Sequence, residues 1–412
     1  MPSALPHGDP APSDGRLPGP VLESARGARF GVYVHVPFCQ TRCGYCDFNT
    51  YTASELGPGV SRGAYADTVL HEIRLAGQVL TDGDALGDRI QPVQTIFFGG
   101  GTPTLLPAEH LGLVIEEIAE QFGLAEDVEI TTEANPETVT PAYFAKLREA
   151  GFTRVSIGMQ SAVPDVLAVL DRQHRAGRPE AAVAEARRAG FEHINLDLIY
   201  GAPRETDGDW QTSLDAAIGA EPDHLSAYAL VVEDGTALAR QVAQGVLPAP
   251  DDDVLADRYV MADESLQAAG FDWYEVSNWS RGDAARCRHN ELYWSDANWW
   301  GLGPGAHSHI SGVRWWNVKH PVRYAAQVEA GRSPAAARET LDAAARHTER
   351  VMLGVRLRDG LPMSALPEAR HRAATQLATY GLVQHSALDE GRIVLTQRGR
   401  LLADAVVREL LG

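Results

Sequence analysis

The stretch "HVPFCQTRCGYCDF" at residues 35–48 contains three of the four cysteines in the chain. Three residues separate Cys39 from Cys43, and two separate Cys43 from Cys46. A structural zinc site normally takes four protein ligands, but the only other cysteine, Cys287, lies far along the sequence. An iron–sulfur cluster held by three cysteines leaves one iron open to a substrate or cofactor. The spacing therefore favours a cluster, with zinc as the alternative.

The cysteines follow the first of six apolar runs that have the composition of strands. These runs are rich in Val, Ile, Phe and Tyr and occupy residues 31–37, 94–100, 127–134, 153–160, 193–201 and 224–231. Helical candidates alternate with them at 61–80, 108–122, 141–150, 177–190, 209–220 and 252–270. This alternation predicts a parallel sheet with right-handed crossovers, most economically a complete or partial barrel. An open, doubly wound sheet is the alternative.

Length and composition indicate the number of domains and the cellular compartment. A chain of 412 residues exceeds one typical domain, which predicts a large domain and a smaller one. No run of about 18 apolar residues occurs, so we expect no membrane-spanning helix. Residues 1–29, rich in Pro and Gly, are expected to form a disordered leader. Few cysteines, mostly in one cluster, do not make a disulfide framework, which indicates a cytoplasmic location.

The alternation of strands and helices ends at about residue 332, and a different pattern follows. Helical segments near 341–356 and 367–380 precede a hairpin that turns at "DEG" (389–391) and a final helix from about 397. This is a winged-helix-like α+β outline, and residues 331–412 carry 12 Lys/Arg against 9 Asp/Glu. The net charge of −19 opposes binding to nucleic acid, so we expect no such partner. The predicted units are the leader 1–29, a barrel at 30–285, a connecting segment 286–331 and a C-terminal domain 332–412.

The cysteine motif resembles a known signature. Cys39-x3-Cys43-x2-Cys46, with Tyr45 before the third cysteine, is similar to the motif of radical S-adenosylmethionine (SAM) enzymes. That superfamily places the motif after the first strand of an α/β partial TIM barrel, and the amino and carboxylate groups of SAM chelate the open iron. The resemblance implies that Cys39, Cys43 and Cys46 hold a [4Fe-4S] cluster and that SAM is a cofactor.

Further motifs indicate one family within this superfamily. "YVHVPFC" (33–39), "GGGTPT" (99–104), "EANP" (133–136), "SIGMQS" (156–161), "LDRQH" (170–174) and "NLDLIYGAP" (195–203) fall in order and resemble the oxygen-independent coproporphyrinogen III oxidase family. Alone, a GGGT turn is usually only a turn, and a strand-end carboxylate is as often a helix cap as a site. The ordered set implies that SAM is bound by Tyr33, Tyr45, Gly100, Gly101, Thr102, Glu133, Gln160, Arg172 and Asp197.

One position departs from the oxidases of that family. They carry a fourth cysteine two residues after the third, where this chain has Phe48. A heme chaperone branch of the same family has Phe at that place and is thought to bind heme and hand it on. The difference counts against oxidase activity, and the sequence assigns no catalytic residue.

The segment "CRHNELYW" (287–294) points to the same branch, which uses His-Asn-x-x-Tyr-Trp as a heme-associated motif. The resemblance implies His289 as a heme ligand and Cys287 as a possible thiolate ligand or attachment point. His307 and His309 in the following glycine-rich stretch are alternatives. Without the family match, a histidine among aromatic residues is more often a packed core residue.

Three functions therefore compete. The resemblance favours a heme chaperone that passes heme to a heme-requiring acceptor protein, which can be membrane-associated. The alternative is oxidative decarboxylation of coproporphyrinogen III to protoporphyrinogen IX, in which a radical made from SAM abstracts a propionate hydrogen. A nucleic-acid-binding protein with structural metal is the third, and it leaves the SAM motifs unexplained.

Overall fold

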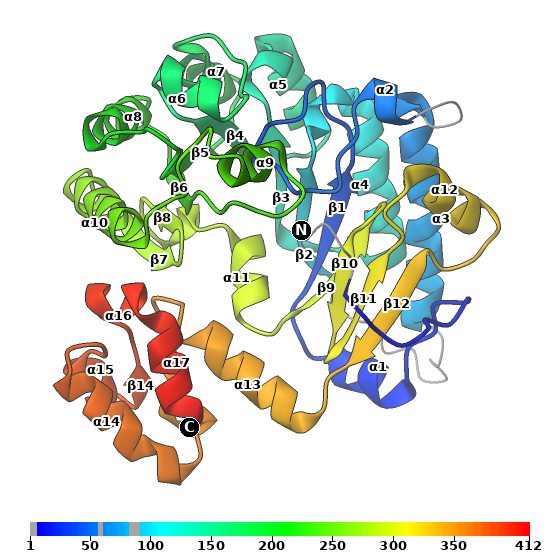
Figure 1. Cartoon of the computed structure of the whole chain (residues 1–412). Helices are drawn as coiled ribbons and strands as arrows, with labels where there is room; N and C mark the ends of the chain where they lie inside the picture. Colours follow the sequence, from blue (N-terminus) through cyan, green and yellow to red (C-terminus); the bar gives the residue numbers. More distant parts are fainter. Residues whose placement is uncertain (1–5, 57–60, 82–90) are drawn as a thin grey trace.

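The computed structural model describes residues 6–56, 61–81 and 91–412. Within them, twelve strands form one sheet in the order β12-β11-β10-β9-β1-β2-β3-β4-β5-β6-β8-β7 (Figure 1). Their bounds are β1 Phe30–Val36, β2 Val93–Gly100, β3 Leu124–Ala134, β4 Arg154–Gln160, β5 His193–Tyr200, β6 His224–Ala229, β7 Asp272–Glu275, β8 Asn278–Ser280, β9 Asn298–Leu302, β10 His307–Ile310, β11 Val313–Asn317 and β12 Ala335–Thr340.

The six predicted strands are β1 to β6, and each pairs in parallel with the next. The crossovers carry α2 Ala53–Leu56, α3 Arg62–Thr81, α4 Ala108–Phe122, α5 Pro141–Glu149, α6 Pro164–Val169, α7 Arg178–Arg188 and α8 Asp207–Gly219, and α9 Ala237–Ala243 and α10 Asp252–Ala268 follow β6. The antiparallel strands β8 and β12 lie toward the two ends of the strand order, and no pairing joins those ends among the residues described. The predicted α/β partial barrel is confirmed.

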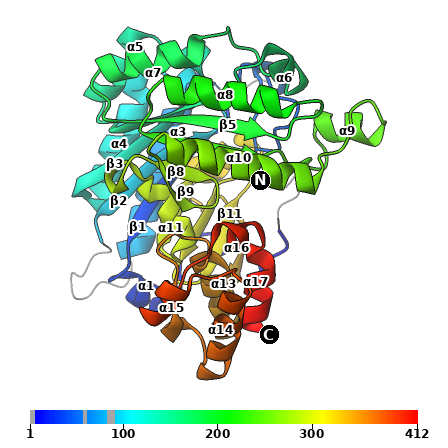
Figure 2. The same ribbon diagram turned by 90° about the vertical axis from the view of Figure 1, so that its left-hand side faces the viewer.

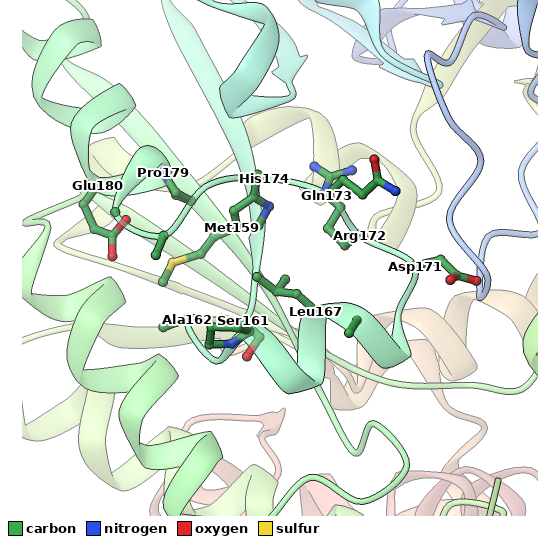
Figure 3. A pocket seen from close by; sticks show the side chains of 14 residues that line it. Met159, Ser161, Ala162, Leu167, Asp171, Arg172, Gln173, His174, Pro179 and Glu180 are labelled. Atoms are coloured by element: carbon green, nitrogen blue, oxygen red, sulfur yellow. The ribbon is translucent and has the colours of Figure 1, made fainter.

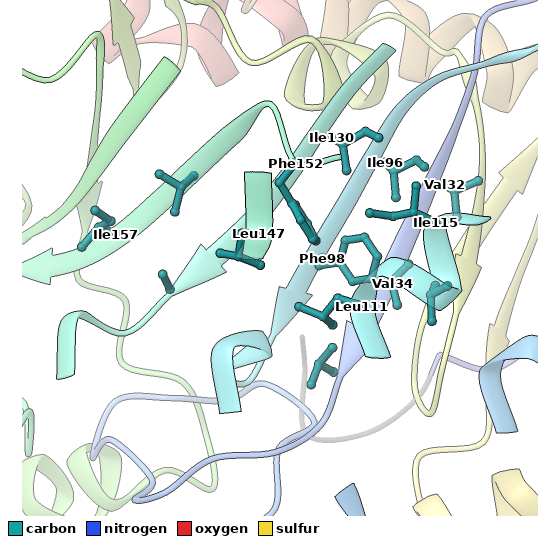
Figure 4. Packing of buried hydrophobic residues seen from close by; sticks show 14 of the residues in the cluster. Val32, Val34, Ile96, Phe98, Leu111, Ile115, Ile130, Leu147, Phe152 and Ile157 are labelled. Carbon is teal, nitrogen blue, oxygen red and sulfur yellow. The ribbon is translucent and has the colours of Figure 1, made fainter. Parts of the chain in front are cut away.

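Burial on both faces explains why these strands appear in the sequence as continuous apolar runs. Strand β1 is buried along almost its whole length, as expected of a parallel strand covered on both faces. Figure 4 shows Val34 and Phe98 from neighbouring strands against Leu111 and Ile115 of α4. Leu111 and Ile115 are four residues apart, which places both on one face of the helix. This packing fixes the carboxyl ends of the strands, where the predicted motifs lie.

The prediction of a disordered leader is wrong for the described part, residues 6–29. This part contains α1 Gly19–Ala25, and Leu17 and Ala25 are buried. Asp9 exchanges two backbone hydrogen bonds with Arg338 of β12, at 2.8 and 2.9 Å. The apolar anchors and backbone pairing stabilise a segment whose Pro- and Gly-rich composition indicated disorder.

The predicted connecting segment 286–331 is also different from expectation. It contributes α11 Arg288–Trp294, α12 Pro321–Glu329 and three strands of the main sheet, of which β9 pairs in parallel with β1. The Trp300 and Trp315 rings pack edge to face with centroids 4.7 Å apart. The last strand of the sheet, β12, ends at Thr340, so the C-terminal unit begins near residue 341 rather than 332.

The C-terminal unit contains α13 Ala343–Gly354, α14 His371–Thr379, α15 His385–Asp389, α16 Gln397–Leu401 and α17 Ala403–Leu411. The predicted helices near 341–356 and 367–380 are present, but the first arm of the predicted hairpin is largely helix α15. The strand β14 Arg392–Ile393 pairs with β13 Leu361–Pro362, and the two predicted arms meet at an isolated antiparallel bridge between Val383 and Leu395. Figures 1 and 2 show these helices gathered on one side of the sheet, with α16 close to α10.

A buried ion pair joins the C-terminal unit to the barrel. The Arg400 guanidinium donates to both carboxylate oxygens of Asp263 on α10, at 3.0 and 2.5 Å, and Asp263 is fully buried. Burial alone would raise the pKa of Asp263, but hydrogen bonds from Arg400 and Trp279 outweigh it and lower the pKa. None of the helices described here is long and apolar enough to cross a bilayer.

Candidate functional site

A cavity of about 550 Å³ opens at the carboxyl ends of the parallel strands. Its walls come from the loop after β1, the turn after β2 and the ends of β3 to β6. The cavity is lined by eleven of the predicted cluster and SAM residues, namely Cys39, Cys43, Tyr45, Cys46, Gly100, Gly101, Thr102, Glu133, Gln160, Arg172 and Asp197. Tyr33 does not line it, and its hydroxyl is 3.0 Å from His35 Nδ1.

The loop that carries the cysteines is fixed at both ends. The Cys39 amide donates to the Tyr51 carbonyl at 3.0 Å, and the Tyr51 amide donates to the Pro37 carbonyl at 2.7 Å. Burial raises the pKa of the Cys46 thiol to about 11 and also raises that of Cys39. A bound metal would reverse this effect, because thiolates are stabilised by coordination.

The three cysteines lie together in the wall of the cavity. Among residues 6–56, 61–81 and 91–412, no three His, Cys, Asp or Glu side chains converge closely enough to hold one metal ion. A cubane cluster has no such requirement, because each thiolate binds a different iron. Three cysteines in one cavity wall fit that ligand set.

Arg172 brings a positive charge to the cysteines. One guanidinium nitrogen lies 3.8 Å from Cys43 Sγ, and another donates to the carbonyl of Gly158 at 3.0 Å. A side chain at Gly158 would collide with this guanidinium, because its Cβ would lie 2.8 Å from Arg172 Nη2. Arg172 and Gln173 also line a second pocket of about 410 Å³, under the loop that leads to Pro179 (Figure 3).

The glycines of the turn after β2 allow close backbone contact. The Gly101 amide donates to Val36 at 2.8 Å, and the Thr102 amide donates to Phe38 at 2.7 Å. A Cβ on Gly101 would lie 2.5 Å from the carbonyl oxygen of Phe38. Gly100 has φ +104°, a conformation that glycine adopts without strain. The turn therefore rests on the backbone that enters the cysteine loop.

Two carboxylates are held inside the cavity. Burial, with Asp197 nearby, raises the pKa of Glu133 to about 8, although the Gly100 amide donates to it at 3.1 Å. Burial likewise raises the pKa of Asp197, which accepts hydrogen bonds from Ser156 Oγ at 2.7 Å and Asn195 Nδ2 at 2.8 Å. A pair of poorly solvated acids favours a cationic ligand group, because a cation stabilises their ionised form.

A buried chain of hydrogen bonds supports Asp197 and was not predicted. Because Asn195 donates to Asp197, its oxygen accepts from His224 Nδ1 at 2.6 Å. His224 Nε2 then accepts from the Tyr274 hydroxyl at 2.7 Å, and the Cys287 amide donates to that hydroxyl at 3.2 Å. The chain reaches from the cavity to the start of α11. His224 opens a predicted strand, but no local motif marks it.

The predicted heme ligands lie outside the cavity. His289 is buried, its Nδ1 is 2.7 Å from Thr95 Oγ1, and its Nε2 is 2.9 Å from the Tyr293 hydroxyl. Burial lowers the pKa of His289 to about 3, which keeps the imidazole neutral. Cys287 is buried and its Sγ lies 3.7 Å from Glu129 Oε1, while burial raises its pKa. Neither residue presents a free ligand atom in this conformation.

The two alternative histidines differ from each other. His309 is buried, with Nδ1 3.0 Å from the Ala297 carbonyl and Nε2 accepting from the Gly312 amide at 3.0 Å. His307 is half-buried and stacks on Trp316, with ring centroids 5.9 Å apart. Heme ligation by any of these histidines stays a prediction.

Comparison with known families matches two regions of the chain. The model of the radical SAM superfamily matches residues 33–217. The model of the HemN C-terminal domain matches residues 341–402, in agreement with the end of β12.

Whole-chain relatives extend the match. The chain is 54% identical over 396 residues to the heme chaperone HemW of Mycobacterium tuberculosis, covering 96% of this chain and 98% of that protein. It is 30% identical over 389 residues to HemW of Bacillus subtilis, covering 92% and 98%. Among solved structures, coproporphyrinogen III oxidase (HemN) from Escherichia coli superimposes with a TM-score of 0.79 at 23% identity, covering 97% and 94%. The last similarity shows the fold alone.

Proposed function

The chain belongs to the family of the heme chaperone HemW, and on that premise we propose that it binds heme and transfers it to an acceptor protein. The scaffold for this function is a radical SAM domain that holds a [4Fe-4S] cluster and SAM. The observation that carries the proposal is the 54% identity to a heme chaperone over 96% of the chain. Phe48, in place of a fourth cysteine, supports the same function.

The residues around the cavity fit the two cofactors. Cys39, Cys43 and Cys46 would hold the cluster, and the backbone of the glycine turn would approach SAM without a side chain in the way. A cluster bound by these cysteines would supply the electron for reductive cleavage of SAM. Glu133 and Asp197 would pair with the cationic groups of SAM, which offsets the burial of their carboxylates.

Arg172 would serve the cluster by charge. Three cysteine thiolates and the sulfides of a cluster concentrate negative charge in a partly buried site, and the guanidinium 3.8 Å from Cys43 Sγ opposes it. Because Arg172 also lines the cavity, its charge would act on a group bound there as well. Arg172 would therefore connect the two cofactors electrostatically.

The acceptor of heme is proposed to be a heme-requiring apoprotein, which can be membrane-associated, and the protein itself is proposed to act in the cytoplasm. Oxidative decarboxylation of coproporphyrinogen III is the competing function, since the HemN fold is shared over nearly the whole chain. The two functions differ in what happens to the tetrapyrrole: a chaperone returns it unchanged.

One anaerobically reconstituted sample separates the two functions. Half is titrated with heme while the Soret band is followed, and half receives coproporphyrinogen III, SAM and a reductant before analysis for protoporphyrinogen. We expect saturable heme binding without decarboxylated product. Product formed over many turnovers would make the protein an oxidase and refute the chaperone function.

A further inference from the structure

The mouth of the cavity carries an exposed apolar surface. Phe48 is 44% exposed, Tyr228 41% and Val231 61%, and all three line the same cavity. We call these three side chains the mouth patch. When large apolar side chains are exposed together around one opening, they usually form a binding surface.

The exposure of Phe48 is built into the loop. Its neighbours Asn49 and Thr50 are buried, and Asn49 Nδ2 donates to the carbonyls of Pro304 and Lys319, both at 2.9 Å. The Thr50 amide donates back to the Phe48 carbonyl at 2.8 Å. Because the following residues are anchored inward, the Phe48 ring is directed outward at the cavity rim.

The second part of the mouth patch is tied to the same loop. The Leu238 amide donates to the carbonyl of Gly44 at 2.9 Å, which links the segment after β6 to the cysteine loop. The Leu230 amide donates to the Tyr200 carbonyl at 2.8 Å, and the Leu230 side chain is buried. The side chain of the next residue, Val231, therefore projects outward. Both sides of the mouth are thus held together as one surface.

The charges at the mouth are unevenly placed. Arg42, on the cysteine loop, is half-exposed, and its guanidinium donates to the Phe48 carbonyl at 3.3 Å and lies 3.9 Å from Glu55. On the other side, Glu233 lines the cavity beside Val231, whereas Asp47 lines it next to Phe48, on the same loop as Arg42. A ligand with an apolar plane and carboxylates would therefore cover the mouth patch and direct its carboxylates toward Arg42.

From this arrangement we infer that heme docks across the mouth patch, with its propionates toward Arg42. The inference rests on the proposed function, because it takes heme as the ligand. A cavity of about 550 Å³ already has to hold the cluster and SAM, so a macrocycle lies across its opening rather than within it. Docking there leaves His289 in its hydrogen bonds to Thr95 and Tyr293.

The test is anaerobic heme titration of full-length reconstituted variants. Phe48→Ser and Val231→Ser should each raise the heme Kd by about tenfold, the effect of losing one well-packed apolar contact. Leu113→Ser is the matched control, because Leu113 lies on α4, is 44% exposed and does not line the cavity. Its Kd should stay within about twofold of the parent protein, since surface changes away from a site have small effects.

Two further measurements sharpen the result. Arg42→Gln should weaken binding of heme but not of its dimethyl ester, which lacks the carboxylates. Iron and sulfide counts show whether a variant keeps its cluster; if Phe48→Ser loses it, Val231→Ser, outside the cysteine loop, decides the question.

The outcomes separate the inference from the proposed function. If the parent protein binds heme and both mouth variants bind it equally well, the mouth patch is not the docking surface and the inference is overturned. A loss of binding in His289→Ala with intact binding in the mouth variants would overturn it in favour of α11. Absence of saturable binding by the parent protein would refute the proposed function, and this inference with it.

Discussion

Gly101→Ala should damage the cluster site without touching a cysteine. The added Cβ would lie 2.5 Å from the Phe38 carbonyl oxygen and 2.9 Å from that of Val36. Both obstacles are backbone atoms, so no flexible side chain can move aside. Relief requires the turn after β2 to separate from the backbone that leads into the cysteine loop by about half an ångström or more.

The size of the effect follows from these contacts. Overpacking of a rigid site costs about 1–3 kcal/mol. Separation also strains the hydrogen bonds from the Gly101 and Thr102 amides, at 2.8 and 2.7 Å, each of which contributes about 1 kcal/mol. We therefore expect a loss of about 2–4 kcal/mol in the free energy of unfolding, together with fewer iron atoms per chain.

Gly219→Ala is the matched control for Gly101→Ala. Gly219 is the last residue of α8, and a Cβ there would meet nothing within 4 Å. It should be neutral or stabilise by up to about 1 kcal/mol, because alanine restricts the unfolded chain. Chemical denaturation and iron and sulfide analysis after reconstitution measure both variants. Parent-like stability and a full cluster in Gly101→Ala would show that the turn does not support the loop as described.

Three other changes test separate parts of the structure. Cys43→Ala should abolish the iron–sulfur absorption of the reconstituted protein while leaving a folded chain; unchanged iron and sulfide counts would disprove the ligand assignment. Glu133 has a pKa raised to about 8 in the folded state, so the parent protein loses stability as pH rises from about 4.5 to about 8. Glu133→Gln has no carboxyl group to ionise, so its free energy of unfolding should gain about 2 kcal/mol relative to the parent protein between these two pH values. This is less than the pKa shift alone would give, because the cavity is open to water. Thermal melts that show the same difference at every pH would exclude a buried, protonated Glu133. Arg400→Met leaves the buried Asp263 carboxylate without its cation and should cost about 3–5 kcal/mol in denaturation; a cost below about 1 kcal/mol would show that this pair does not hold the C-terminal unit to the barrel.

The parts of the structure that follow from local sequence were predictable. The apolar run at 94–100 corresponds to β2 Val93–Gly100, and the helical pattern at 108–122 coincides with α4. Motifs such as "GGGTPT" and "EANP" follow predicted strands, and parallel strands present their carboxyl ends on one side. The family resemblance implied that Gly101 and Glu133 share a site, this topology is consistent with it, and the structure places both in one cavity.

The parts that depend on distant partners were not predictable. Strand β9 pairs with β1 through Phe30 and Asn298, a long-range contact without a local signal. The His289 imidazole is engaged by Thr95, which is 194 residues away. The resemblance to the His-Asn-x-x-Tyr-Trp motif implied a ligand at His289, where the structure shows both ring nitrogens in hydrogen-bonding contacts. His224 was missed for the same reason, since its role comes from Asn195 and Tyr274 on other strands.

The most direct test of the central claim is the rate of heme transfer. The protein is loaded with heme and mixed either with a heme-requiring apoprotein from the same cell or with an equal concentration of a general heme scavenger, and the Soret band of each product is followed. A chaperone should deliver heme to the acceptor faster than it loses heme to the scavenger, because delivery passes through a direct complex. Equal rates in the two mixtures would mean that heme only dissociates into solution, and would contradict the proposed function.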